Sequence, residues 1–290
     1  MGSFKGHVLP GSMFVMVGVW HLLNSITNYV VNPKAFRSRV WHPVRCFSGK
    51  GRYLELYVLL VGTFTDMCIE FFYSTHLKFT VNGAINTTHL NDFEHAAMLL
   101  MFFLFCVAAL VNETTRWLPL PEGSLFVVAA MAFTAEYLLF YFHSTNHHGL
   151  EGRYHQILVL LIGLCIVCAL LAAAYPENFA VDIVSGMAIT LQGAWFYLIA
   201  FTLYGPLMPE GCSDVNDEII CEGDSFEARG ESLAHIQLAV LVPCLWILLL
   251  VAYGAAAHFW GHPEIYHPRP DLTESRSDVL DSPESSSAEH

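Results

Sequence analysis

Seven long runs of apolar residues dominate the chain, and shorter polar stretches separate them. A helix needs about 20 predominantly apolar residues to cross the hydrocarbon core of a bilayer. Runs this long must be helical, because backbone polar groups find no water partners inside lipid, and no alternating strand pattern competes with that interpretation. The predicted spans are residues 8–31, 53–75, 90–111, 123–142, 154–175, 180–204 and 232–260. The pattern therefore predicts an all-α, multi-pass integral membrane protein whose seven-transmembrane-helix bundle occupies residues 1–262.

The composition agrees with this pattern. Hydrophobic residues make up 54% of the chain and charged residues only 13%, whereas soluble domains are about 25% charged. The lipid bilayer is the expected partner. A basic nucleic-acid binder, a disordered protein and a disulfide-framed secreted module are all excluded. Residues 263–290 are acidic and rich in serine, and they predict a disordered cytosolic tail because they have little apolar surface to bury.

The distribution of Lys and Arg predicts how the bundle is oriented. Six of the 13 basic residues lie between the first two spans, so that loop is expected in the cytosol. The N-terminus is then lumenal or extracellular and the C-terminus cytosolic. The same orientation places the sequon at Asn86 on the lumenal side, where it predicts a glycoprotein. It also places Cys212 and Cys221 in an oxidising compartment, where they are expected to form a disulfide.

Histidines gather on one side of this predicted topology. The chain has 15 of them, and eight fall in the lumenal half: His76, His89, His95, His143, His147, His148, His155 and His235. Glu70 and Glu136 lie at similar depth. Ionisable groups inside a bilayer are costly and usually face the bundle interior, where they pair or function.

Imidazole and carboxylate are the ligands that zinc prefers in proteins. The preferred ligand set is His95, His143 and His155, with Glu70 or Glu136 as a fourth ligand or as the acid/base beside a bound water. His148 and His235 are the alternates, and the adjacent His147 leaves open which of the pair faces the site. A hydrogen-bonded packing network and a pH-sensitive cluster are the competing interpretations.

Several short motifs resemble the transmembrane protein 45 family. These are Gly6-His7-Val8-Leu9-Pro10-Gly11, Gly18-Val19-Trp20, Asn91 followed by His95, and Glu136 followed by His143 and His155. The resemblance covers about residues 1–260. It implies a seven-span protein of the endomembrane system (Golgi or endosome) or the plasma membrane. Plant members of that family are grouped as a domain of unknown function, so no biochemical activity is implied.

Three functions remain open at this point, and enzymatic activity is not decided. The first is a multi-pass membrane protein without catalytic activity, in which the histidine cluster is structural. The second is a zinc-dependent intramembrane hydrolase acting on a lipid-like amide or ester, with Glu70 or Glu136 handling the proton. The third is a carrier of metal ions or protons, which the nearly pure apolar cytosolic halves of the third to fifth spans disfavour. Protein partners are not indicated.

Overall fold

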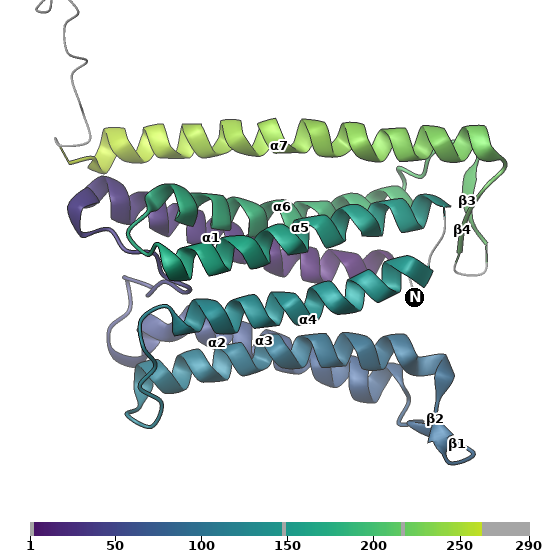
Figure 1. The fold of residues 1–290 in the computed structure, drawn as a ribbon, viewed down its shortest axis with the longest axis horizontal. Coiled ribbons are helices and arrows are strands. Elements are labelled where there is room, and N and C mark those ends of the chain that lie inside the picture. The colour runs from purple at the N-terminus through teal and green to yellow at the C-terminus, as the bar shows by residue number, and fades with distance from the viewer. Residues whose placement is uncertain (1–2, 147–148, 216–217, 263–290) are drawn as a thin grey trace, which may run out of the picture.

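Seven long helices form the protein in the computed structural model, which describes residues 3–146, 149–215 and 218–262. All seven are long and apolar enough to cross a membrane, α2 together with the helical turns on either side of it (Gly49–Ser74), so the predicted fold class is confirmed. They run side by side along the long axis of the molecule (Figure 1). The helices are α1 Phe4–Val31, α2 Leu54–Cys68, α3 Leu90–Thr114, α4 Ser124–Asn146, α5 Gly149–Ala174, α6 Phe179–Leu203 and α7 Asp224–Trp260.

The two ends of the bundle differ. The end where α1 begins, called the N-terminal end below, carries two short hairpins (Figure 1). Loop 32–53, which holds the six basic residues, lies at the other end, called the basic-loop end. Residues 147–148 and the tail 263–290 lie outside the described part of the chain, so the predictions for His147, His148 and the tail fall outside it too.

Short elements connect the helices. Helical turns η1 Pro33–Ala35, η2 Gly49–Tyr53 and η4 Thr87–His89 lie in the connections, and η3 Ile69–Ser74 continues α2 as a π-helix. The antiparallel hairpins are β1 Thr80–Val81 with β2 Ala84–Ile85 and β3 Cys212–Val215 with β4 Glu218–Cys221. The hairpins lie between the apolar runs. Hydropathy does not predict them, because each of their strands has four residues or fewer.

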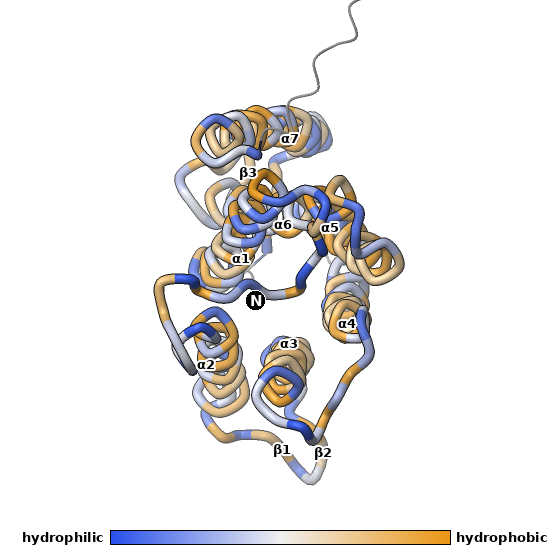
Figure 2. The backbone as a smooth tube through the Cα atoms, turned by 90° about the vertical axis from the view of Figure 1, so that its left-hand side faces the viewer, coloured by the Kyte–Doolittle hydropathy of each residue, from blue (hydrophilic) through white to orange (hydrophobic). Residues whose placement is uncertain are grey.

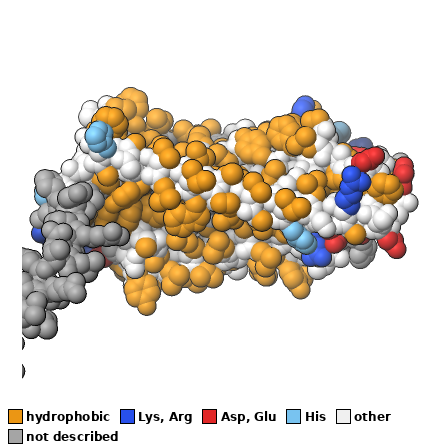
Figure 3. All heavy atoms as spheres, turned by 90° about the horizontal axis from the view of Figure 1, so that it is seen from above, with side chains coloured by type: hydrophobic (Ala, Val, Ile, Leu, Met, Phe, Trp, Pro, Cys, Tyr) orange, Lys and Arg blue, Asp and Glu red, His pale blue; other side chains and the backbone are white. Residues whose placement is uncertain are grey.

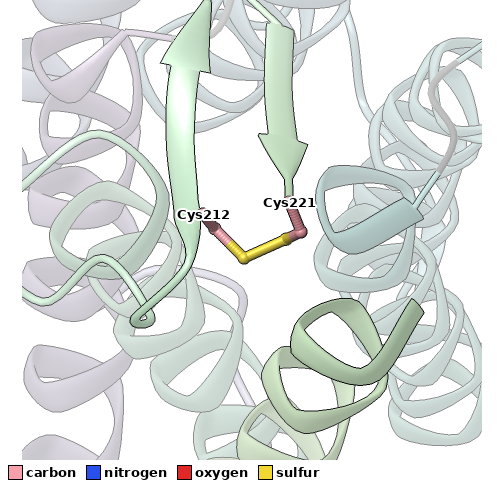
Figure 4. The surroundings of a disulfide bond; sticks show 2 residues. All are labelled: Cys212 and Cys221. Atoms are coloured by element: carbon pink, nitrogen blue, oxygen red, sulfur yellow. A yellow bond between two sulfur atoms is a disulfide. The ribbon is translucent and has the colours of Figure 1, made fainter. Parts of the chain in front are cut away.

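A disulfide closes the second hairpin, as predicted. Cys212 and Cys221 face each other in register and are bonded (Figure 4).

Asn86, the predicted glycosylation site, is largely buried: its Nδ2 donates to the Lys78 carbonyl and its Oδ1 accepts from Thr88. Its glycosylation stays a prediction.

Helices α1 and α6 approach each other most closely. A Cβ added at Gly18 would lie 2.6 Å from the backbone nitrogen of Thr190, and one at Gly193 would lie 2.5 Å from that of Val15. Only glycine fits at such positions, and small residues let membrane helices bring their backbones together in this way. The close approach is important because α1 and α6 carry most of the buried polar side chains that lie on the seven long helices.

The core of the bundle lies along α5 and α6. Trp195 and Tyr154 are fully buried there, with their rings stacked at 5.4 Å and the Trp195 Nε1 donating to the Tyr154 carbonyl. Helices α2 and α7 lie at the periphery and expose mostly apolar side chains. The space-filling view shows an apolar middle with acidic and basic side chains gathered at the N-terminal end (Figure 3). This distribution suits a helix bundle whose flank contacts lipid.

Candidate functional site

The centre of the N-terminal end is a pair of buried histidines. His155 comes from the first turns of α5 and is 1% exposed. Its Nδ1 lies 2.9 Å from the Glu151 carbonyl oxygen, and its Nε2 lies 3.3 Å from Nε2 of His7 on α1. The Nδ1 of His7 lies 2.9 Å from the carbonyl oxygen of Ser3, the residue that caps α1.

These contacts define the chemistry of the pair. A carbonyl oxygen only accepts hydrogen bonds, so each Nδ1 must carry the proton. In a neutral imidazole the other nitrogen then holds a lone pair, and the two Nε2 lone pairs of His7 and His155 face each other. Such an arrangement is unfavourable unless a proton or a metal ion lies between the nitrogens. Metal-bound histidines have their second nitrogen fixed by a carbonyl or carboxylate in the same way.

Other rings surround the pair. The ring centroid of His143, from the end of α4, lies 5.4 Å from that of His155 in an edge-on arrangement. On the other side, the ring of Tyr204 stacks on His7 at 5.0 Å. The Tyr204 hydroxyl donates to Glu151 Oε1 at 2.7 Å, and burial together with the nearby Glu151 carboxylate raises the pKa of Tyr204 above its usual range. That hydroxyl therefore stays a donor, and it fixes Glu151 one turn before His155.

His95 lies near a carboxylate from another element. Its Nδ1 lies 3.9 Å from Oε1 of Glu70, which belongs to the π-helical segment η3. Short π-helical segments inside α-helices occur frequently at functional sites. Within the described residues, no group of three or more His, Cys, Asp or Glu side chains is arranged to hold a metal ion. The ligand set of His95, His143 and His155 therefore stays a prediction.

Glu136 belongs to a packing network. It is fully buried on α4, and its Oε1 accepts from Nε2 of Gln192 on α6 at 2.8 Å. The thiol of Cys165 on α5 donates to Oε1 of Gln192 at 3.2 Å. This chain joins three helices through buried polar groups, as interhelical hydrogen bonds do in membrane proteins. Of the two alternates, His235 is exposed on α7, and His148 lies outside the described residues.

His7 and Glu151 were missed by the interpretation of the sequence. His7 precedes the first predicted span by one residue, so hydropathy places it in a polar leader. Glu151 lies in the polar start of α5, ahead of the predicted span 154–175. The usable signal was the i, i+4 spacing of Glu151 and His155, which places both on one helix face.

A second buried cluster lies towards the basic-loop end. His21 Nε2 of α1 lies 3.2 Å from Oδ1 of Asp182 of α6, which is fully buried. The ring of His42, from loop 32–53, packs edge-on against His21 with centroids 5.0 Å apart. No functional role was predicted from the sequence for His21 or Asp182. The close approach of α1 and α6 buries the two side chains against each other.

Glu55 ties this second cluster to the loop. Its Oε2 accepts from the backbone N–H of His42 at 2.6 Å and from Nε1 of Trp20 at 2.9 Å. Burial, with the neighbouring His21 as a smaller contribution, lowers the pKa of His42 to about 3, so this ring is neutral at physiological pH.

An apolar cavity of about 430 Å³ lies between α1, α2, α3, α4 and α6. Phe14, Phe102 and Phe133 line its middle, while Asp66 and His21 are among its few polar lining residues. The volume is within the range of about 300–1,000 Å³ that is typical of small-molecule sites. In the end-on view these helices surround the bundle axis (Figure 2).

The fold and composition define the class: a seven-helix integral membrane protein with buried histidine clusters. Residues 122–254 match the model of a family of unknown function, DUF716. The chain is also similar to transmembrane epididymal protein 1A of mouse (Mus musculus), with 21% identity over 231 residues that cover 75% of this chain and 73% of the relative. The family match spans α4 to most of α7, so it includes His143, Glu151 and His155 but not His7 or His95.

Proposed function

We propose that this membrane protein binds a divalent metal ion of the zinc class at the N-terminal end of the bundle, with His7 and His155 as its first two ligands. The supporting observation is the 3.3 Å separation of their Nε2 atoms, with each Nδ1 held by a backbone carbonyl. Zinc binds imidazole nitrogens at about 2.0–2.1 Å, so two ligands of one tetrahedral ion lie about 3.3 Å apart. Coordination would convert the opposed lone pairs from a cost into two bonds.

His143 is the proposed third ligand. Its ring is already in contact with His155, and a change of side-chain rotamer suffices to redirect one of its nitrogens. The proposal keeps two members of the ligand set derived from the sequence and replaces His95 with His7, because His7 approaches His155 directly whereas Nδ1 of His95 lies 3.9 Å from Glu70. The site is a two-histidine core to which the third ring is added when the metal binds.

Elemental analysis of detergent-purified protein tests the proposal. Full-length protein supplied with zinc is expected to retain about one ion per chain, and His7→Gln or His155→Gln is expected to lose it. His258→Gln is the matched control, since His258 lies on α7 at the other end of the bundle. Equal zinc content in all four proteins would contradict the proposal. A wild type without zinc would mean that the pair shares a proton instead.

A zinc-dependent hydrolase with a lipid-like substrate is the second candidate. The apolar cavity of about 430 Å³ favours it, because a hydrocarbon chain could occupy that space. Zinc would supply a bound water of lowered pKa. Among the carboxylates, Glu151 is better placed than Glu70 or Glu136 to accept a proton, since it lies beside His155 and bonds Tyr204.

Turnover of long-chain ester and amide probes tests this candidate. Zinc-loaded wild type is expected to hydrolyse a probe that Glu151→Gln does not hydrolyse, while both proteins retain zinc. Absence of turnover in zinc-loaded protein would remove the hydrolase and leave the metal site unaffected.

A further inference from the structure

A second, polar cavity lies at the basic-loop end, apart from the proposed metal site. It has a volume of about 360 Å³ and lies between the last turns of α1 and loop 32–53. Its polar lining includes Arg37, Arg39, Arg45, His42, Asn24 and Asn28, and none of its lining residues is acidic. The whole chain carries a net charge of −13 with only 13 Lys and Arg residues. Three of those scarce cations therefore line one small cavity.

The three arginines are not equivalent. Arg37 is neutralised, because it forms ion pairs with Glu122 at 2.5 Å and Glu177 at 2.9 Å. These contacts anchor the loop to the segments on either side of it. Arg37 is therefore a structural residue of the cavity wall.

Arg39 and Arg45 keep their charges. Arg45 donates to the side-chain oxygen of Asn28, which is a neutral acceptor. Arg39 forms no hydrogen bond or ion pair with any residue in the described part of the chain. Among the described residues, no carboxylate thus balances these two guanidinium groups in the cavity. Guanidinium groups present several N–H donors in a planar fork that matches a phosphate group.

His42 adds an independent observation. It is 1% exposed, and neither of its ring nitrogens has a hydrogen-bond partner among the described residues. An unpartnered polar group in a buried position is destabilising. The carboxylates near this ring face other groups: Glu55 accepts from the backbone of His42 and from Trp20, and Asp182 Oδ1 lies 3.2 Å from His21 Nε2. A ligand with hydrogen-bond acceptors in the cavity would satisfy the ring.

We propose that this cavity binds a phosphomonoester, with Arg39 and Arg45 pairing with the phosphate oxygens and His42 donating to one of them. The charge, the volume and the unpartnered ring all favour a compact dianion over a neutral ligand. The phosphate can come from a lipid headgroup, since the cavity lies at the end of a membrane helix, or from a soluble phosphate compound. Basic clusters beside membrane helices attract anionic lipids, but a cavity with placed donors adds selectivity for phosphate.

Native mass spectrometry of the full-length protein tests the proposal. The protein is released from nanodiscs of phosphatidylcholine that contain either phosphatidic acid, a phosphomonoester, or phosphatidylserine, a phosphodiester of the same leaflet charge sign. Wild type is expected to retain phosphatidic acid about tenfold better than phosphatidylserine, as two charge-assisted contacts imply. Arg39→Gln is expected to remove this preference. It is expected to leave thermal unfolding unchanged, because Arg39 forms no hydrogen bond or ion pair with the described residues.

The matched control is Lys50→Gln, which removes one charge from the same loop outside the cavity. It is expected to keep the preference. Glycerol 3-phosphate and inorganic phosphate are added as competitors in a parallel series. Displacement of phosphatidic acid by either compound at similar concentration assigns a soluble phosphate, and retention of the lipid assigns the headgroup; both outcomes support the site. Equal retention of the two lipids by wild type, or equal losses in Arg39→Gln and Lys50→Gln, would overturn it.

Discussion

At the N-terminal end of the bundle, His7 and His155 each donate Nδ1–H to a backbone carbonyl, whereas at the basic-loop end His21 faces the carboxylate of Asp182. Both pairs involve α1 and both are buried. The difference lies in the second partner. A carboxylate compensates an imidazolium directly, so the His21–Asp182 pair needs no added cation. Two imidazoles with opposed lone pairs are complete only when a cation joins them.

The comparison teaches that buried histidine alone does not indicate a metal site. The cluster at the N-terminal end is short of positive charge, and the cluster at the basic-loop end already contains its own counter-charge. Removing one residue from each pair should therefore lower stability by different amounts and should affect cation binding at only one of them. The predictions below exploit that contrast.

The largest effect is expected for Asp182→Asn. Breaking a buried ion pair by removing one partner costs about 3–5 kcal/mol, because the other partner stays buried. By contrast, His155→Gln in metal-free protein is expected to lower the free energy of unfolding by only about 1 kcal/mol, the net value of one hydrogen bond. The same substitution also removes the unfavourable contact between the two Nε2 atoms. Unfolding in mixed detergent micelles measures both. The double variant His21→Gln with Asp182→Asn should recover part of the loss, and a cost of Asp182→Asn no larger than that of His155→Gln would contradict the contrast.

The next effect is stabilisation by zinc. A ligand present at 100 times its Kd adds about 2.7 kcal/mol to the free energy of unfolding. We expect zinc to raise the midpoint of thermal unfolding in wild type and in Asp182→Asn, but not in His7→Gln. If zinc stabilised His7→Gln and failed to stabilise Asp182→Asn, the metal would belong to the other cluster.

Sequence alone predicted the seven spans, because each consists of about 20 or more apolar residues and the bilayer admits only helices. It predicted the Cys212–Cys221 disulfide from spacing and compartment. It did not predict that His7 would contact His155. The two residues are 148 positions apart, and hydropathy does not indicate which way a residue ahead of the first span faces. It also did not predict that Asp182 would be buried, because that burial depends on the glycine contacts between α1 and α6, which are tertiary.

Gly18→Ala is expected to affect the two histidine clusters differently. The added methyl group would overlap Thr190 of α6, and overpacking typically costs about 1–3 kcal/mol. Because α1 would move away from α6, the His21–Asp182 contact should weaken more than the His7–His155 contact, whose second partner is on α5. Unfolding midpoints with and without zinc report this: the midpoint falls while the zinc-dependent shift remains. Gly254→Ala is the control, since no other side chain lies within 4 Å of that position.

The smallest effect concerns the side of the membrane that each cluster faces. It involves no change in stability, and chemical labelling tests it. The basic loop predicts a cytosolic position for Cys46, which is exposed and free. A membrane-impermeant maleimide should therefore label Cys46 in cells whose plasma membrane alone is opened with digitonin, and Cys46→Ser should lose that label. The His7–His155 pair would then face the lumen or the cell exterior. Labelling of Cys46 in intact cells, or only after full solubilisation, would reverse the orientation and place the proposed phosphate site away from cytosolic phosphate compounds.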